Sequence, residues 1–254
     1  MTAPNFAETA NSDPSARYAI YWAPPGDSML ARLGSAWLGR DAERDARADS
    51  LPPRPPIPGF TSEQLEALTA EPRRYAFHAT LKAPFALASG CDLRTLHAQL
   101  AAFASSRERF VIPPLRLSPI GRRFLALMPS APCLPLDDLA AGCVTRFDHF
   151  RRLAAPEELL RRRAAGLDSI EDANLQRWGY PYVLDRFRFH VTLTGPLDPE
   201  LLERLSEPLA ALFAPATRAP IPIDDIALFR EPAPGGAFTL VARFPFGRSA
   251  KRSS

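Results

Sequence analysis

A twelve-residue phrase occurs twice in this chain, with the same histidine and threonine in each copy. The first copy, residues 74–85, reads RYAFHATLKAPF, and the second, residues 186–197, reads RFRFHVTLTGPL. The chain has four histidines, and two of them, His78 and His190, occupy the same position in the two copies. A repeat of this kind indicates that the chain contains two structurally similar halves.

Both copies alternate apolar and polar residues, as a half-buried β-strand does. The polar face is expected to carry His78, Thr80 and Lys82 in the first copy and Arg188, His190, Thr192 and Thr194 in the second. A repeat kept for folding alone would preserve the apolar face and leave the polar face free to vary. Here the histidine and threonine match while core positions differ, as Ala79 and Val191 do. We therefore interpret the polar faces as functional.

The same succession of elements follows each copy. A helical pattern comes first, over residues 92–104 and 199–213, and two strand-like runs follow in each case. Short strands that return on one another, with helices to one side, predict an α+β fold with antiparallel sheets. We expect a bilobal architecture, in which two pseudo-symmetric antiparallel β-sheet lobes with outer helices surround a central cleft.

This pattern divides the chain into one folded domain and two tails. The expected divisions are a disordered tail over 1–16, a single bilobal domain over 17–246 and a flexible tail over 247–254. Within the domain we expect a first half at about 17–130, a helical connector at about 136–184 and a second half at about 185–246.

Composition and missing motifs exclude several classes of function. The net charge is only +3, and no basic block interleaved with aromatic residues is present, so stable nucleic-acid binding is not expected. The chain has no apolar run of the roughly 18 residues that span a bilayer and no secretory signal at its start. It also lacks a phosphate-binding G-x-x-x-x-G-K-[ST] sequence and a zinc-binding H-E-x-x-H sequence. We expect a cytoplasmic monomer with no membrane partner.

The two motifs do not by themselves suggest a metal centre. No carboxylate lies on the polar face of either motif strand, and two histidines would need one or two further ligands. We expect no metal and no cofactor.

The paired motifs resemble the two-histidine phosphoesterase superfamily, which includes bacterial 2′,5′ RNA ligase-like enzymes and cyclic nucleotide phosphodiesterases. The segments RYAIYWAPP, RRYAFHATLKAPF, RWGYPYV, FRFHVTLTGPL and ALFREPAPGGAF are similar to the branch encoded beside the carbon–phosphorus lyase genes of phosphonate degradation. This resemblance covers nearly all of residues 17–246. It implies a bilobal fold in which His78, Thr80, His190 and Thr192 line the cleft, and it allows the chain to cross between lobes.

Imidazole chemistry suits the reaction that the resemblance implies. Opening a cyclic phosphodiester requires a base that takes a proton from water and an acid that protonates the departing sugar oxygen. His78 and His190 are the expected acid and base, in an order that the sequence leaves open. Thr80 and Thr192 are expected to bind the phosphate oxygens. Further candidates for binding substrate phosphate are Lys82, Thr194 and Arg188.

The expected activity is metal-independent hydrolysis of 5-phosphoribosyl 1,2-cyclic phosphate, the cyclic sugar phosphate that carbon–phosphorus lyase chemistry yields. Two alternatives remain open at this stage. One is processing of RNA ends, either by 2′,3′-cyclic phosphate hydrolysis or by 2′,5′ joining. The other is a binding module that senses a phosphorylated sugar or nucleotide without turnover.

Overall fold

The computed structural model describes four stretches of the chain: residues 15–43, 51–121, 123–164 and 166–247. Residues 1–14 and 248–254, which make up most of the two predicted tails, lie outside the described residues. Ala16, the last residue of the predicted N-terminal tail, is buried in the core.

Seven of the described strands form one antiparallel sheet in the order β4-β5-β6-β2-β1-β8-β9, and two short strands, β3 and β7, form a second. In chain order the strands are β1 (Arg17–Trp22), β2 (Ala79–Phe85), β3 (Phe110–Ile112), β4 (Leu115–Ile120), β5 (Phe124–Pro129), β6 (Val191–Thr192), β7 (Ile221–Ile223), β8 (Asp225–Glu231) and β9 (Thr239–Pro245).

Helices connect and cover these strands. They are α1 (Met29–Leu38), α2 (Ser62–Arg73), α3 (Leu93–Ser105), α4 (Leu134–Arg146), α5 (Pro156–Arg163), α6 (Ser169–Trp178) and α7 (Pro199–Thr217), with short 3₁₀ turns η2 (Asp148–Phe150) and η3 (Leu184–Arg186). The predicted α+β class is confirmed. The segment predicted as a helical connector contains most of α4 and all of α5 and α6.

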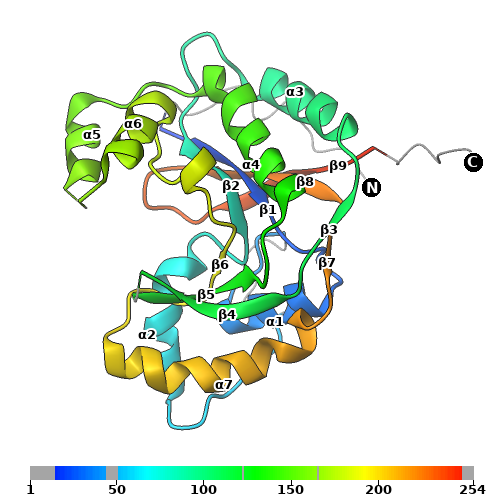
Figure 1. The fold of residues 1–254 in the computed structure, drawn as a ribbon, viewed down its shortest axis with the longest axis vertical. Coiled ribbons are helices and arrows are strands. Elements are labelled where there is room, and N and C mark those ends of the chain that lie inside the picture. Colours follow the sequence, from blue (N-terminus) through cyan, green and yellow to red (C-terminus); the bar gives the residue numbers. More distant parts are fainter. Residues whose placement is uncertain (1–14, 44–50, 122, 165, 248–254) are drawn as a thin grey trace, which may run out of the picture.

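The large sheet is divided between two lobes (Figure 1). Helices α1, α2 and α7 lie with β4, β5 and β6, whereas α3 and α4 lie with β2, β1, β8 and β9. Each hairpin joins the motif strand of the other half of the sequence: β4–β5 pairs with β6, and β8–β9 reaches β2 through β1. The chain therefore crosses between the lobes repeatedly, and β3 and β7, which lie on two of these crossings, pair with each other.

Local sequence signals explain where the helices before the first motif begin. The Ser28 side chain accepts a hydrogen bond from the Ala31 backbone N–H at 3.1 Å and caps α1. Thr61 and Gln64 form a reciprocal capping box at the start of α2, at 3.3 and 2.8 Å. Both arrangements satisfy backbone N–H groups that have no partner within the helix. None of the helices in the described part of the chain is long and apolar enough to cross a membrane.

The second motif forms less strand than its alternation predicts. The turn η3 replaces the start of the predicted strand, with Leu184 in the left-handed region at φ 53°, and β6 contains only Val191 and Thr192. Beyond Thr192 the backbone hydrogen bonds go to different neighbours, because the Leu193 N–H donates to β5 whereas the Gly195 N–H donates to α2. Alternation in sequence cannot reveal this change of partner.

One side chain fixes the chain just after the H-x-T core of the second copy. The indole N–H of Trp37, a fully buried residue of α1, donates to the Leu193 carbonyl at 2.8 Å. A backbone carbonyl that loses its partner in this environment carries a desolvation penalty. This bond therefore connects α1 to the strand that presents His190.

We expect Trp37→Phe to lower the free energy of unfolding by about 1–3 kcal/mol more than Trp22→Phe does. Both tryptophans are buried, so both variants lose the same ring area. Only Trp37→Phe also leaves the Leu193 carbonyl without its hydrogen-bond donor. Urea unfolding of the two variants and the wild-type protein measures the difference. Equal losses in the two variants would show that the hydrogen bond contributes little.

Candidate active site

The two H-x-T motifs meet in the middle of the large sheet. Ala79 of β2 is the antiparallel partner of Val191 of β6, and both side chains are 0% exposed. Because paired residues point to one face and their neighbours point to the other, the flanking residues share the opposite face. That face, which we call the working face, carries His78, Thr80, His190 and Thr192. All four are half-buried.

Backbone contacts orient the two imidazoles in the same way. The Nδ1–H of His78 donates to the Ala76 carbonyl at 2.9 Å, and the Nδ1–H of His190 donates to the Arg188 carbonyl at 2.7 Å. A carbonyl oxygen only accepts, so Nδ1 carries the proton and Nε2 is the basic nitrogen of each neutral ring. Ala76 adopts φ 59°, a conformation that costs energy for a residue with a Cβ atom.

The surroundings favour the neutral form of both imidazoles. Burial lowers the pKa of His78 to about 4, although its bond to Ala76 acts in the opposite direction and His190 lowers the pKa slightly further. Burial also lowers the pKa of His190. The Thr80 hydroxyl lies 3.3 Å from His78 Nε2, where it donates to that nitrogen. A neutral imidazole whose lone pair is on Nε2 can accept a proton there from a reacting group.

Aromatic rings hold the imidazoles in place, and these residues were not among the predicted site residues. Tyr21 stacks on His78 with ring centres 3.9 Å apart, and Tyr75 lies 6.0 Å from the same imidazole. Phe124 lies 6.2 Å from His190. Burial raises the pKa of Tyr21 well above its usual value and that of Tyr180 to about 12. The register Tyr21↔Thr80 places Tyr21 on the working face, which only the pairing of β1 with β2 reveals.

The predicted position of Lys82 on the working face is wrong. Register shifts occur in the β1–β2 pairing, so Tyr21 pairs with Thr80 whereas Ile20 pairs with Lys82. Ile20 and Tyr21 are neighbours and point to opposite faces, so Lys82 also points away from Thr80. An irregular register of this kind cannot be read from alternation alone.

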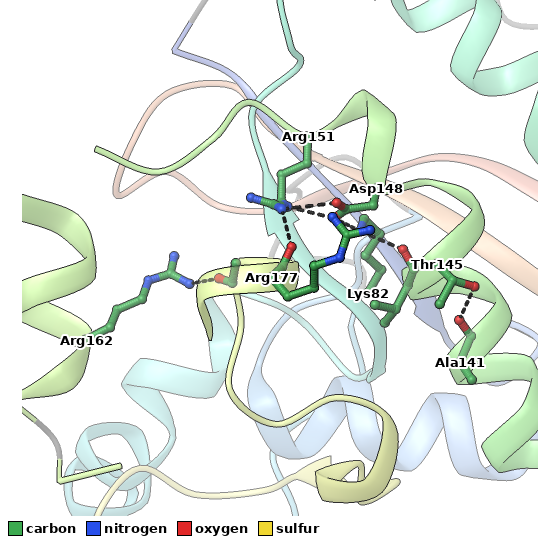
Figure 2. A network of polar contacts seen from close by, with 9 residues as sticks. Lys82, Ala141, Thr145, Asp148, Arg151, Arg162 and Arg177 are labelled. Atoms are coloured by element: carbon green, nitrogen blue, oxygen red, sulfur yellow. Dashed lines mark hydrogen bonds and ion pairs between the residues drawn. The ribbon is translucent and has the colours of Figure 1, made fainter. Parts of the chain in front are cut away.

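Lys82 instead joins a polar network on the face of the sheet opposite to the working face (Figure 2). It is 3% exposed, and its Nζ donates to the Val144 carbonyl at 3.2 Å and lies 3.5 Å from Asp148. Arg151 donates to both carboxylate oxygens of Asp148, at 2.8 and 3.1 Å, and to the Arg177 carbonyl at 3.0 Å. The network therefore ties β2 to the end of α4 and to the end of α6 (Figure 2).

The other two candidates for phosphate binding have different environments. Thr194 is buried, and its hydroxyl oxygen accepts the Leu125 backbone N–H at 3.0 Å, so it stabilises the sheet rather than facing the site. Arg188 is exposed and precedes His190 by two residues, so its side chain is open to solvent beside the second motif. Among the described residues, no three histidine, cysteine, aspartate or glutamate side chains gather in a way that could hold a metal ion.

The burial of Lys82 leads to a pH-dependent contribution to stability. Burial lowers its pKa from 10.5 to about 8, although Asp148 acts in the opposite direction. Between these two values the unfolded chain binds more protons than the folded chain, so stability rises with pH. We expect the stability of the wild-type protein relative to Lys82→Met to rise by roughly 1 kcal/mol per pH unit above pH 8. Urea unfolding at several pH values measures it, and a constant difference would contradict the burial of a titrating amine.

Comparisons with known proteins identify a family and relatives of this chain. The model of the family described as "Protein of unknown function (DUF1045)" matches residues 80–239, more than half of the chain. A curated relative from Janthinobacterium sp. (strain Marseille), named ribose 1,5-bisphosphate phosphokinase PhnN, is 39% identical over 248 residues, which cover 96% of this chain and 54% of the relative. A relative of the same name from Laribacter hongkongensis (strain HLHK9) is 39% identical over 225 residues, 88% of this chain and 50% of the relative. The chain thus spans about half the length of these relatives.

Solved structures with lower sequence identity also match. The E. coli LigT structure with NADP+ is 16% identical, with a TM-score of 0.39, and the match covers 92% of this chain and 99% of LigT. The structure of TT0787 of Thermus thermophilus is 17% identical, with a TM-score of 0.42, and the match covers 92% of this chain and all of the other. This chain belongs to the DUF1045 family.

Proposed function

We propose that this chain is a metal-independent cyclic phosphodiesterase that opens 5-phosphoribosyl 1,2-cyclic phosphate. The observation that carries the proposal is the pairing of Ala79 with Val191, which puts two histidines and two threonines on one face of the sheet. Each imidazole is held by its Nδ1–H, so each presents Nε2 as the reactive nitrogen. A phosphate bound between them would have a proton acceptor and a proton donor at hand.

The proposed reaction balances with two proton transfers. Water attacks phosphorus, His78 Nε2 takes its proton, the bond from phosphorus to the sugar oxygen breaks, and protonated His190 gives its proton to that oxygen. His78 suits the role of base because its pKa, lowered to about 4, keeps it neutral in the free protein. Thr80 and Thr192 would donate to the non-bridging phosphate oxygens, where negative charge must be stabilised. Neither transfer requires a metal.

The curated relatives support the choice of substrate and of the bond that breaks. Their printed name describes a kinase that acts on ribose 1,5-bisphosphate, and this chain matches about half of each relative. If the sugar oxygen O2 is the leaving group, opening of a 1,2-cyclic phosphate on ribose 5-phosphate yields that same bisphosphate. We therefore propose that the P–O2 bond breaks. Isolation of ribose 2,5-bisphosphate as the product would contradict this choice.

Replacement of His78 or His190 by alanine should lower kcat by about 10²–10⁴-fold, the usual effect of a lost general acid or base. The matched control is His149→Ala, because His149 is exposed and lies outside the working face. The release of ribose 1,5-bisphosphate from the cyclic phosphate, followed by phosphorus NMR, measures the rates. A wild-type rate in either site variant would remove that histidine from the mechanism.

The same assay separates the alternatives when a chelator and a 2′,3′-cyclic nucleotide are added as further arms. Loss of turnover with chelator would contradict the metal-free mechanism. A preference for the cyclic nucleotide by orders of magnitude would favour the processing of RNA ends. Binding of both compounds without turnover would favour a sensor module.

The pH profile of kcat/KM should be bell-shaped with its optimum below pH 6.5. The mechanism needs one neutral and one protonated imidazole, a form that is most abundant between the two apparent pKa values of the pair. Burial lowers both pKa values below their usual 6.5, so the optimum moves to more acidic pH. A cyclic phosphate with no second phosphate group provides the control for ionisation of the substrate. An optimum above pH 7.5 with both substrates would contradict the assignment.

A further inference from the structure

The working face continues beyond the histidines to a pair of arginines that share one carboxylate. Glu231 of β8 is 0% exposed, whereas the side chains of Arg17 and Arg74 are 30% and 31% exposed. The Nε–H of Arg17 donates to one oxygen of Glu231 at 2.5 Å, and Arg74 and the Gly235 backbone N–H donate to the other. Two positive charges therefore face one negative charge, and the cluster keeps a net positive charge.

Strand register places this cluster on the same face as the histidines. Arg17 pairs with Glu231 and Tyr21 pairs with Ala227 without a register shift, so Arg17 and Tyr21 point to one face of β1. Tyr21 in turn shares the face of Thr80. The cluster thus lies along the working face, toward the start of β1.

A layer of aromatic rings fills the space between the arginines and His78. The Arg74 guanidinium lies 5.1 Å from the centre of the Tyr75 ring, which is 6.0 Å from the His78 ring. The Arg17 guanidinium lies 6.0 Å from the Phe238 ring, which stacks on Tyr75 at 5.1 Å. The Tyr75 ring therefore lies between Arg74 and His78, and the Phe238 and Tyr75 rings lie between Arg17 and His78. A ligand with two charged ends could lie across these rings.

The arginines also keep hydrogen-bond donors for a ligand. Arg17 binds Glu231 through Nε, and neither of its two terminal nitrogens has a partner among the described residues. Arg74 donates through Nε to the Gly236 carbonyl and through one terminal nitrogen to Glu231. Arginine N–H pairs match the oxygens of a phosphate group, and a buried carboxylate that fixes the guanidinium reduces the ordering cost of binding.

We propose that Arg17 and Arg74, oriented by Glu231, form a second anion subsite that binds the terminal phosphate monoester of the substrate. This subsite rests on the proposed function, because it takes the 5-phosphate of a sugar whose cyclic phosphate lies between His78 and His190. It accounts for selection of a doubly phosphorylated sugar over a simple cyclic phosphate.

The test compares substrates that differ only in the second phosphate: 5-phosphoribosyl 1,2-cyclic phosphate and ribose 1,2-cyclic phosphate. Arg17→Gln should lower kcat/KM by about 10- to 100-fold for the first substrate and leave the second unchanged. Arg17→Lys keeps a charge beside Glu231 but loses the paired N–H donors, so it should show the same selective loss. The control is Arg107→Gln, which removes an arginine that is 24% exposed and ion-paired with Asp138 of α4.

Direct binding separates this proposal from the proposed function. Calorimetry compares the binding of ribose 5-phosphate with that of ribose. The wild-type protein and His78→Ala should bind ribose 5-phosphate more tightly than ribose. Arg17→Lys should lose this phosphate-dependent binding. That result would support the subsite even if no cyclic phosphate is turned over. An equal loss for both substrates in the Arg17 variants would show that the cluster only stabilises the fold. Unchanged binding of ribose 5-phosphate in Arg17→Lys would contradict the proposed subsite and leave the proposed hydrolase activity unaffected.

Discussion

The pairing of Ala79 with Val191 joins the two motif strands at the centre of the sheet, and the geometry of the candidate site depends on it. Both side chains are buried in the core, and a register in which either histidine faced inward would bury a polar imidazole in their place. A slip of one residue would move every side chain of β6 to the other face. Burial of two small apolar residues is therefore what keeps both imidazoles on the working face.

The crossing of the chain between lobes stabilises this central contact from both sides. The hairpin β4–β5 follows the first motif in sequence but supports β6, and the hairpin β8–β9 follows the second motif but extends the sheet beside β1 and β2. Neither motif strand is supported only by its own half of the chain. Trp37 adds a further connection by donating to the carbonyl of Leu193, just beyond β6.

Lys82 illustrates why alternation succeeds for some residues of a strand and fails for others. The pattern correctly places His78 and Thr80 on one face, because no irregularity interrupts the chain between them. One step further along, the register shift in β2 turns Lys82 toward α4, where Asp148 and the Val144 carbonyl compensate for its burial. Tyr21 and Arg17 lie on the working face although the sequence did not predict it. Alternation within β1 gave no reason to connect them with histidines that are distant in sequence.

The sequence by itself determined the candidate histidines and threonines, the α+β class and the repeat, since these follow from residue type and from the period of the apolar pattern. Only the tertiary structure decided which residues share the site. Strand pairing brings Arg17, Glu231 and Tyr21 to the face of His78, and the register shift removes Lys82 from it. The physical reason is that side-chain period is a local property, whereas pairing partners and registers are set by burial and hydrogen bonding between distant segments.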